Sequence, residues 1–456
     1  MKNTTLFILG CMLCFGGAKA QDWDSVGSGI NGLARACAVY NGELYVGGYN
    51  ITRAGASTVS NIARWNGTSW SGVGTGISVY GGIGAMQVYN GNLYVGGGFD
   101  TAGGVPVNNV AVWNGSIWAK AGTGISGGQA YIEAFAIYKG NLIAGGAFDS
   151  ADGIAVNNIA VWNGSVWSAL GLGFPGGAVA SLLSYDSVLY AGGSFTNAGG
   201  HPASNIAQWN GSTWSAVGTG ISAFDGGVLS MVTFNRQLYA GGEFDTAGGM
   251  VASNIARWNG SKWDSVGSGA GLYYYSYTNS VQSLTVAGGI LYAAGWFHTA
   301  GKVAVNNVAS WNGSKWSSVG AGMNDTAVFA LELYNSHLYA AGLFLVSGTT
   351  PVNNIARWGM PLGVPDIKTS NDVAIYPNPN KGNFTISLSN TGLVSASQPI
   401  IEIYNIMGQK VFVETLKQVQ GGNTINLSGN PSGVYLYRVV TQEGNLVGEG
   451  KVLIER

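Results

Sequence analysis

The sequence contains little charge. Lysine, arginine, aspartate and glutamate make up 9% of the 456 residues, and the formal net charge is −1. Ordinary soluble proteins carry about 25% charged residues. Because the chain has no block of basic residues, we expect no electrostatic site for nucleic acid or for an anionic membrane.

The chain also lacks a hydrophobic run long enough to span a bilayer. The apolar stretch at residues 6–15 follows Lys2 and precedes the small-residue pattern at 18–20. This arrangement predicts a secretory signal peptide over residues 1–20, cleaved before Gln21. The alternative is a lipoprotein signal cleaved before Cys11, which would leave almost no apolar core upstream.

Cysteine is nearly absent from the mature chain. Cys11 and Cys14 leave with the signal peptide, so only Cys37 remains. One cysteine excludes an intrachain disulfide and a cysteine metal site. Cys37 lies in an alternating apolar segment, which favours a buried small side chain over a reactive thiol.

Glycine and aromatic residues, by contrast, are abundant. The sequence has 75 glycines, and 11% of its residues are aromatic. Glycine usually makes up about 7% of a protein. The aromatic content argues against disorder. Together they indicate a large all-β protein with many tight turns.

Fourteen of the fifteen tryptophans recur with a period of 47 to 53 residues. Such a period is typical of propeller blades or solenoid turns. Each period holds four strand-like segments separated by Asn-Gly turns, in the second copy 84–89, 92–99, 108–113 and 117–122. Four antiparallel strands per period predict one propeller blade. The two tryptophan series are Trp65, Trp113, Trp162, Trp209, Trp258, Trp311 and Trp358, and Trp23, Trp70, Trp118, Trp167, Trp214, Trp263 and Trp316.

The two ends of the repeat region complement each other. The last copy stops at residues 353–358 and lacks its fourth strand, whose motif Trp-x-Ser-Val-Gly begins the mature chain at residues 22–27. We therefore expect the chain ends to complete a seventh blade. The N-terminal strand would then close a seven-bladed β-propeller over residues 21–360 and leave no exposed sheet edge.

The repeated motifs Leu-Tyr-Val-Gly-Gly-x-Phe and Asn-Ile-Ala-x-Trp-Asn-Gly resemble those of secreted β-propellers related to the kelch type. The resemblance covers residues 22–360. It implies an architecture and no particular activity, because propellers serve as enzymes, lectins and scaffolds.

The composition changes after Trp358. Residues 361–371 predict a linker, and residues 372–456 predict a small β-sandwich of seven strands at 373–376, 383–388, 400–404, 409–415, 424–427, 433–440 and 450–454. Several motifs here resemble the type A C-terminal sorting domain of the Bacteroidetes type IX secretion system. Its motif residues are Tyr376, Pro377, Asn378, Pro379, Gly382, Gly408, Gly433, Tyr435 and Lys451.

The resemblance implies a partner and a destination. The partner is the type IX secretion machinery, which exports such proteins through the outer membrane. The sorting domain is then removed, and the rest of the chain is attached to the cell surface or released. The alternative is an ordinary fibronectin-like module without a sorting role.

The sequence offers little for catalysis. Its three histidines fall in separate repeats without metal-ligand spacing, and no Gly-x-Ser-x-Gly motif occurs. Three aspartates share one repeat position, which favours a turn residue over an acid pair. We therefore predict no catalytic residue, no metal site and no cofactor. The residues concerned are His201, His298 and His337, and Asp100, Asp149 and Asp245.

The longer connections of each predicted blade lie on the face opposite the Asn-Gly turns, where binding residues concentrate. The loops between blades carry residues that the repeat does not dictate. They predict either a recognition platform for glycan or protein, or simple packing over the core. They are Tyr80, Tyr131, Phe174, Phe224, Asp225, Tyr273, Tyr274, Tyr275 and Tyr277.

The sixth blade departs furthest from the repeat. It follows the tyrosine run at 273–277, and Trp296 is the one tryptophan outside both series. His298 stands where several copies have Asp or Thr. We predict a ligand site here, with packing of Trp296 beneath the loop as the alternative.

These observations predict a monomeric propeller, secreted or attached to the outer surface, that binds a glycan or a protein and is not an enzyme. The alternative is a polysaccharide lyase or hydrolase of propeller fold. Non-repeated acids or histidines clustered at the centre would favour the enzyme, and repeat-equivalent residues there would favour the binding module.

Overall fold

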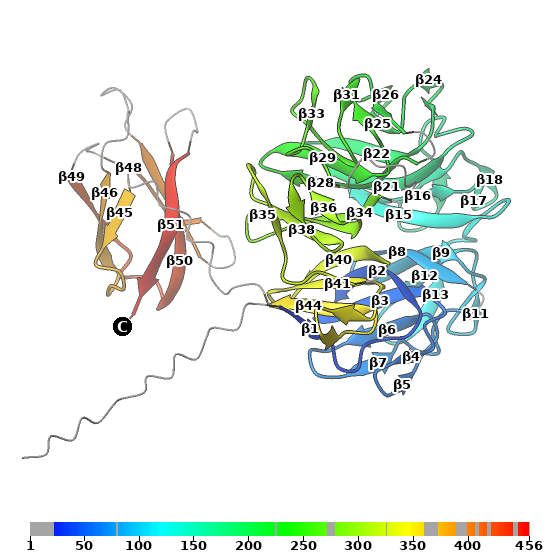
Figure 1. The fold of residues 1–456 in the computed structure, drawn as a ribbon, viewed down its shortest axis with the longest axis horizontal. Coiled ribbons are helices and arrows are strands. Elements are labelled where there is room, and N and C mark those ends of the chain that lie inside the picture. The colour runs from blue at the N-terminus through cyan, green and yellow to red at the C-terminus, as the bar shows by residue number, and fades with distance from the viewer. Residues whose placement is uncertain are drawn as a thin grey trace, which may run out of the picture. The chain divides into compact units, whose positions relative to one another are not determined.

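The computed structural model describes residues 22–78, 81–223, 226–270, 279–324, 326–359, 373–388, 399–405, 410–416, 421–440 and 446–455. The predicted signal peptide and linker lie outside these ranges. The chain divides into two compact units, Met1–Met360 and Pro361–Arg456. Both units are built from β-strands (Figure 1). Among the described residues, no helix has the length and apolarity to cross a membrane.

The second repeat illustrates the basic sheet of the first unit. Strands β8 (Gly82–Tyr89), β9 (Asn92–Gly98), β12 (Val110–Trp113) and β13 (Trp118–Lys120) form an antiparallel sheet in the order β13-β12-β9-β8. The four predicted segments each overlap one of these strands and differ by up to two residues at each end. The third strand starts late because Asn109 adopts a left-handed conformation, with φ of 60°.

Across its described residues, the first unit contains seven such four-stranded sheets, which we number in chain order. The strands β8, β9, β12 and β13 form sheet two. Sheet one has β2 (Leu33–Tyr40), β3 (Glu43–Tyr49), β6 (Ile62–Trp65) and β7 (Trp70–Gly72); sheet three has β15 (Tyr131–Tyr138), β16 (Asn141–Ala147), β19 (Ile159–Trp162) and β20 (Trp167–Ala169); sheet four has β21 (Ala178–Tyr185), β22 (Val188–Ser194), β25 (Ile206–Trp209) and β26 (Trp214–Ala216). Sheet five has β28 (Val228–Phe234), β29 (Gln237–Gly242), β32 (Ile255–Trp258) and β33 (Trp263–Ser265); sheet six has β34 (Ser280–Ala287), β35 (Ile290–Trp296), β38 (Val308–Trp311) and β39 (Trp316–Ser318); sheet seven has β40 (Ala327–Tyr334), β41 (His337–Leu343), β44 (Ile355–Gly359) and β1 (Trp23–Ser25).

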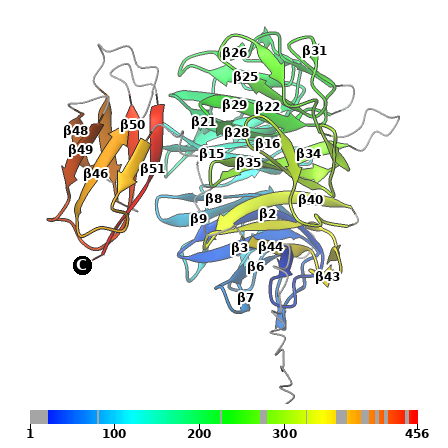
Figure 2. The ribbon, with the colours of Figure 1, turned by 60° about the vertical axis from the view of Figure 1, so that its left-hand side comes forward.

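The first strand of each repeat lies beside the first strand of the next. The order is β2, β8, β15, β21, β28, β34 and β40, and β40 also lies beside β2 (Figures 1 and 2). These inner strands share a bulge, which follows the first residue in β28 and the second residue in the other six. Buried and partly buried residues alternate throughout β2, and less regularly in the other strands. The arrangement is propeller-like, with all sheets antiparallel.

The two ends of this unit pair with each other. Strand β1 runs antiparallel to β44, and Trp23 lies opposite Trp358. The indole Nε1 of Trp23 donates to the carbonyl oxygen of Val319 at 2.9 Å. The Tyr334 hydroxyl donates to the carbonyl oxygen of Gly42 at 3.0 Å. Strand and side-chain contacts therefore join the first residues of the unit to its last.

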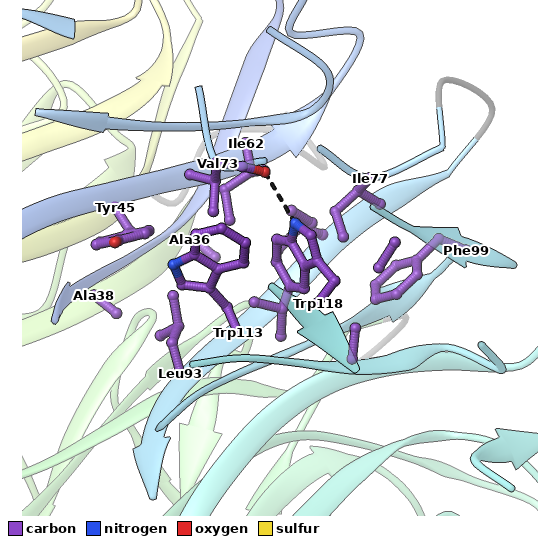
Figure 3. Close-up of a cluster of buried hydrophobic side chains, with 14 of the residues drawn as sticks. Ala36, Ala38, Tyr45, Ile62, Val73, Ile77, Leu93, Phe99, Trp113 and Trp118 are labelled. Carbon is purple, nitrogen blue, oxygen red and sulfur yellow. Dashed lines mark hydrogen bonds between the residues drawn. The ribbon is translucent and has the colours of Figure 1, made fainter. Parts of the chain in front are cut away.

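The paired tryptophans connect neighbouring sheets. In every pair the two indoles lie on paired antiparallel strands, with ring centroids 5.2 to 5.6 Å apart. The second tryptophan also donates its Nε1 proton to a carbonyl of the preceding sheet or the loop after it, at 2.8 to 3.1 Å. Figure 3 shows Trp118 bonded in this way to Val73 beside Trp113. Each pair therefore packs within its own sheet and bonds to the one before it.

A repeated asparagine connects the sheets a second time. In sheet one, Asn61 is 1% exposed; its Oδ1 accepts the Ile51 N–H at 3.1 Å, and its Nδ2 donates to Ser78 O at 2.7 Å and Gly81 O at 2.9 Å. The seven equivalents all have φ between 57° and 66°. Their role was not evident from the sequence, although Asn is among the few non-glycine residues that tolerate this conformation. They are Asn61, Asn109, Asn158, Asn205, Asn254, Asn307 and Asn354.

The two turn types of each repeat differ. Between β8 and β9, Asn90 and Gly91 both have positive φ, 47° and 74°, as the Asn-Gly pattern predicts. Between β12 and β13 only Gly115 does, at 98°. There the Asn114 side chain instead accepts the backbone N–H groups of Ser116 and Ile117, both at 2.9 Å. Both turns are the hairpin turns that the Asn-Gly pattern predicts, and they differ in backbone conformation.

The longer connection between the second and third strands of each repeat, which reads Thr-Ala-Gly-Gly at residues 101–104, forms a short hairpin, where the sequence predicted a loop. In two repeats a third strand, β14 (Ile125–Ser126) or β27 (Ile221–Ser222), joins it from the preceding connection. The hairpins thereby tie the two longer connections together. They are β4 (Arg53–Ala54) and β5 (Ser57–Thr58), β10 (Thr101–Ala102) and β11 (Val105–Pro106), β17 (Ser150–Ala151) and β18 (Ile154–Ala155), β23 (Asn197–Ala198) and β24 (His201–Pro202), β30 (Thr246–Ala247) and β31 (Met250–Val251), β36 (Thr299–Ala300) and β37 (Val303–Ala304), and β42 (Val346–Ser347) and β43 (Thr350–Pro351).

The second unit contains two antiparallel sheets that share a hydrophobic core. All seven predicted segments are strands, four of them with the predicted bounds. One sheet has β45 (Val373–Tyr376), β46 (Asn383–Leu388) and β49 (Gly421–Asn426); the other has β48 (Lys410–Thr415), β47 (Ile400–Tyr404), β50 (Gly433–Val440) and β51 (Leu446–Ile454).

Candidate functional site

The first two strands of sheet two, β8 and β9, each have a glycine at the same end of the sheet. Gly82 pairs with Gly98 across β8 and β9. A Cβ on Gly82 would lie 2.0 Å from Cζ of Tyr49, and one on Gly98 would lie 2.8 Å from Cδ2 of Tyr131. Tyr49 belongs to sheet one and Tyr131 to sheet three. The two tyrosines therefore meet over the bare backbone of the sheet between them.

The two tyrosines form a small aromatic cluster with one ion pair. Their rings are nearly parallel, at 5°, with centroids 6.3 Å apart. The Arg35 guanidinium lies 5.9 Å from the centroid of Tyr131. Its Nη2 is 4.0 Å from Oε1 of Glu133. Burial raises the pKa of Tyr131 above its usual range, so its hydroxyl stays protonated at neutral pH.

An open pocket of about 590 Å³ lies beside this cluster. Tyr49, Tyr131, Gly98, Asn109 and the loop 126–130 line it. None of these residues is charged. We call it the Tyr49–Tyr131 pocket. It lies at the connection between sheets two and three, on the face that the sequence predicted to carry binding residues.

The loop 126–130 of this pocket packs against Asp149. The Asp149 backbone N–H donates to Ser126 O at 3.3 Å. A Cβ on Gly127 would lie only 1.5 Å from Oδ1 of Asp149. Gly127 and Gly128 both have positive φ, 106° and 49°. The loop therefore needs glycine at these positions and presents backbone to the pocket.

The prediction that Phe174 contacts a ligand is wrong, because its side chain belongs to the core. It is fully buried, with its ring centroid 4.6 Å from that of Phe195 and 4.7 Å from that of Trp214. Its loop folds inward because these two aromatic side chains offer an apolar site that excludes water. Seven other predicted contacts lie outside the described residues, namely Tyr80, Phe224, Asp225, Tyr273, Tyr274, Tyr275 and Tyr277.

Trp296 and His298 are both exposed. Trp296 is the last residue of β35 and has 38% of its surface accessible. His298 lies two residues later in the chain. In sheet seven the equivalent positions hold Leu343 and Leu345, with 40% and 56% exposed. In sheet two they hold Gly98 and Asp100. Sheet six therefore carries tryptophan and histidine, and sheet seven two leucines, where sheet two has glycine and aspartate.

Acidic side chains on the inner strands do not form a cluster. Glu133 is the third residue of β15, and Glu332 is the sixth residue of β40. Burial raises the pKa of Glu332 to about 7. Burial, and then the nearby Glu332 charge, raises the pKa of the Cys37 thiol. Among the described residues, no three His, Cys, Asp or Glu side chains are placed to hold a metal ion.

In the second unit, several sorting-motif residues have structural contacts. The Asn378 side chain donates to Lys451 O at 3.0 Å and accepts the Leu453 N–H at 2.8 Å. The Tyr435 hydroxyl donates to Pro431 O at 2.8 Å. Gly382 has φ of 96°, and a Cβ there would lie 2.7 Å from Cα of Ser428. Gly408 lies outside the described residues.

One buried carboxylate organises the larger sheet of this unit. Glu402 accepts hydrogen bonds from Lys410 Nζ at 2.6 Å, from Arg438 Nε, and from the Tyr404 hydroxyl at 2.9 Å. The hydrogen bond from Lys410 is the main cause that lowers the pKa of Glu402 to about 2. The carboxylate therefore stays ionised at all physiological pH values.

Comparisons with known proteins give a family for the second unit. Residues 374–455 match the family of secretion system C-terminal sorting domains. No kelch family model matches residues 22–360. No curated protein matches this chain.

Several solved structures are similar at low identity. One is described as the extracellular domain of a one component system from B. thetaiotaomicron, with 9% identity, TM-score 0.43, and coverage of 96% of this chain and 59% of that chain. Another is a fungal alcohol oxidase in complex with copper, with 12% identity, TM-score 0.37, and coverage of 96% and 100%. A third is a GH43B protein of a Bacteroides ovatus xyloglucan locus, with 9% identity, TM-score 0.28, and coverage of 95% and 92%. We draw no functional inference from them.

The family match gives the chain a destination. Sorting domains of this family direct proteins through type IX secretion. Residues 374–455 are a C-terminal sorting domain of the type IX secretion system, and the protein is exported to the outer cell surface or secreted.

Proposed function

We propose that residues 21–360 form a seven-bladed β-propeller closed by the N-terminal strand. The support is the pairing of β1 with β44 and the contact of β40 with β2. The tryptophan and asparagine bonds between successive sheets recur at this junction as well, through Trp70 to Val26 and Asn354 to Ile30. Under this proposal the junction of the chain ends is one more blade contact of the same kind.

The function that we propose is binding of a glycan or a protein outside the cell, by a monomer and without catalysis. The single observation that carries it is the pairing of a sorting domain with a repeat unit whose departures from the repeat gather on one face. A repeated residue serves the fold in every sheet. The departures, which include Tyr49, Tyr131 and Trp296, are therefore the candidates for recognition.

A retention assay tests the binding function. The purified mature protein is passed over immobilised neutral and acidic polysaccharides and over outer-surface proteins of its native host. We expect saturable retention on at least one of them. Absence of retention on every matrix, with the protein folded, would contradict a binding function.

A second candidate function is that of a polysaccharide-active enzyme. One observation favours it, namely the half-buried Glu332, whose pKa of about 7 suits a general acid. If this candidate holds, the Glu332→Gln variant should lose turnover of a polysaccharide that the wild type cleaves. If no polysaccharide is cleaved by the wild type, the enzyme candidate fails.

A further inference from the structure

We propose that the Tyr49–Tyr131 pocket binds a neutral saccharide unit. This inference rests on the binding function proposed above and adds a site and a ligand class. Three features support it, namely the break in the repeat, the chemistry of the lining and the distribution of charge.

The break in the repeat involves three adjacent sheets at once. The position of Tyr131 is glycine in sheet two, and serine or alanine in sheets four, six and seven. The position of Tyr49 is small in sheets two, three and four. The two tyrosines fit only because Gly82 and Gly98 leave the intervening sheet bare. Packing of the fold does not require this combination, since the other sheets form without it.

The lining combines aromatic faces with short polar groups. The two tyrosine rings supply flat apolar surface. The Tyr131 hydroxyl is itself buried and has no hydrogen-bond partner among the described residues. Ser126 and Gln129 are exposed on the loop, and the glycines at 127 and 128 leave the backbone accessible. The C–H face of a sugar packs on such rings while its hydroxyls bond amides and hydroxyls. The volume of about 590 Å³ falls within the range of small-molecule sites.

The charge distribution favours a neutral ligand. The lining residues are uncharged. The charged groups beside them are the Arg35–Glu133 pair, which is mutually compensated, and the Asp149 carboxylate behind Gly127, which would repel an anion. A uronate or phosphate ligand would bring a charge into the pocket without an opposite charge to pair with, which is unfavourable. A neutral hexose or pentose unit brings none.

Titration calorimetry on the full mature chain, residues 21–456, tests the proposal. The probes are the hexasaccharides of β-1,4-xylose, β-1,4-glucose, β-1,3-glucose and β-1,4-mannose, with hexagalacturonate as a charged counterpart. We expect at least one neutral probe to bind more tightly than hexagalacturonate. We expect Tyr131→Ala to weaken that binding about tenfold or more, as for an aromatic anchor.

Two further variants distinguish a loss of ligand contacts from a loss of stability. Gln129 is exposed on the loop, so Gln129→Ala leaves the fold intact and should still weaken binding. Tyr185→Ala is the matched control, because Tyr185 donates to Arg236 O at 3.2 Å at the tight-turn end of sheet four, away from the pocket. This control should lower the melting temperature and leave the affinity unchanged.

Three outcomes would overturn the proposal. They are binding that survives both Tyr131→Ala and Gln129→Ala, a preference for hexagalacturonate, and no binding of any neutral probe at millimolar concentration. If the retention assay still finds a protein or acidic polysaccharide as ligand, the binding function stands and only the pocket assignment fails. If retention also fails, both fail.

Discussion

Asparagine in the left-handed conformation has a structural role in every sheet of the first unit. Each such residue combines a φ that few side chains tolerate with hydrogen bonds to two connections. The conformation costs an ordinary L-residue roughly 1–2 kcal/mol. Loss of a buried partner adds about 1–3 kcal/mol. The repeated asparagines therefore stabilise the fold by local geometry and by contact between sheets.

Asn61→Ala should lower stability by about 2–4 kcal/mol for this reason. The measurement is the midpoint of urea unfolding of residues 21–360. Asn66→Ala is the control, because Asn66 is exposed and caps only its own turn. We expect its effect to be below about 1 kcal/mol. Equal effects of the two substitutions would contradict the role of Asn61.

Glu332 should make stability depend on pH. Its pKa of about 7 in the fold is above the usual value of 4.5, so the unfolded chain releases the proton first as pH rises. The stability is therefore fully present below pH 4.5 and is lost as pH rises through about 7. Glu332→Gln should raise stability at pH 8, by at most about 3 kcal/mol, and change it little at pH 4. Unfolding midpoints at the two pH values check this. A variant with the same pH dependence as the wild type would contradict it.

At the scale of elements, strands were the most predictable feature. The tryptophan period and the Asn-Gly turns located four strands in each repeat, because alternation and turn chemistry are local properties. The hairpin of the Thr-Ala-Gly-Gly segment was missed because its strands, such as Thr101–Ala102, are only two residues long. Such short strands carry no readable alternation.

The candidate site was less predictable than the strands. Tyr131 stood out as a departure from the repeat, but Tyr49 did not. Their meeting depends on Gly82 and Gly98, which have no special signal in a chain with 75 glycines. Phe174 looked like an exposed loop aromatic, and only the positions of Phe195 and Trp214 show that it is core. Contacts between sheets are not local in the sequence.

Deletion of residues 22–27 should destabilise the first unit strongly. The deletion removes β1, exposes the edge of β44 and leaves Trp358 without the indole at 5.6 Å. We expect aggregation or a large fall in melting temperature. Asp24→Ala in the same strand is the control, because it removes only an exposed contact of 3.9 Å with Arg357 and should cost below about 1 kcal/mol. A deletion variant as stable as the wild type would show that β1 does not close the propeller.

At the scale of the whole molecule, the two units are stabilised separately and in different ways. The first carries few charges and is held by apolar packing and inter-sheet hydrogen bonds. The second is the sorting domain, with its own core and its own buried carboxylate network. Because each unit has a separate core, we expect the first to fold without the second. Export then depends on the sorting domain, and under the proposed function recognition depends on the first unit.

One measurement tests most directly whether export depends on the sorting domain. Unlysed cultures of the native host, cells and medium together, are probed with an antibody to residues 22–359 after expression of the full chain or of a chain ending at residue 372. Lysed samples control for the amount of folded protein. The account predicts that the full chain is detected outside the cells and that the truncated chain is detected only after lysis. Detection of the truncated chain in unlysed cultures at the level of the full chain would contradict the account.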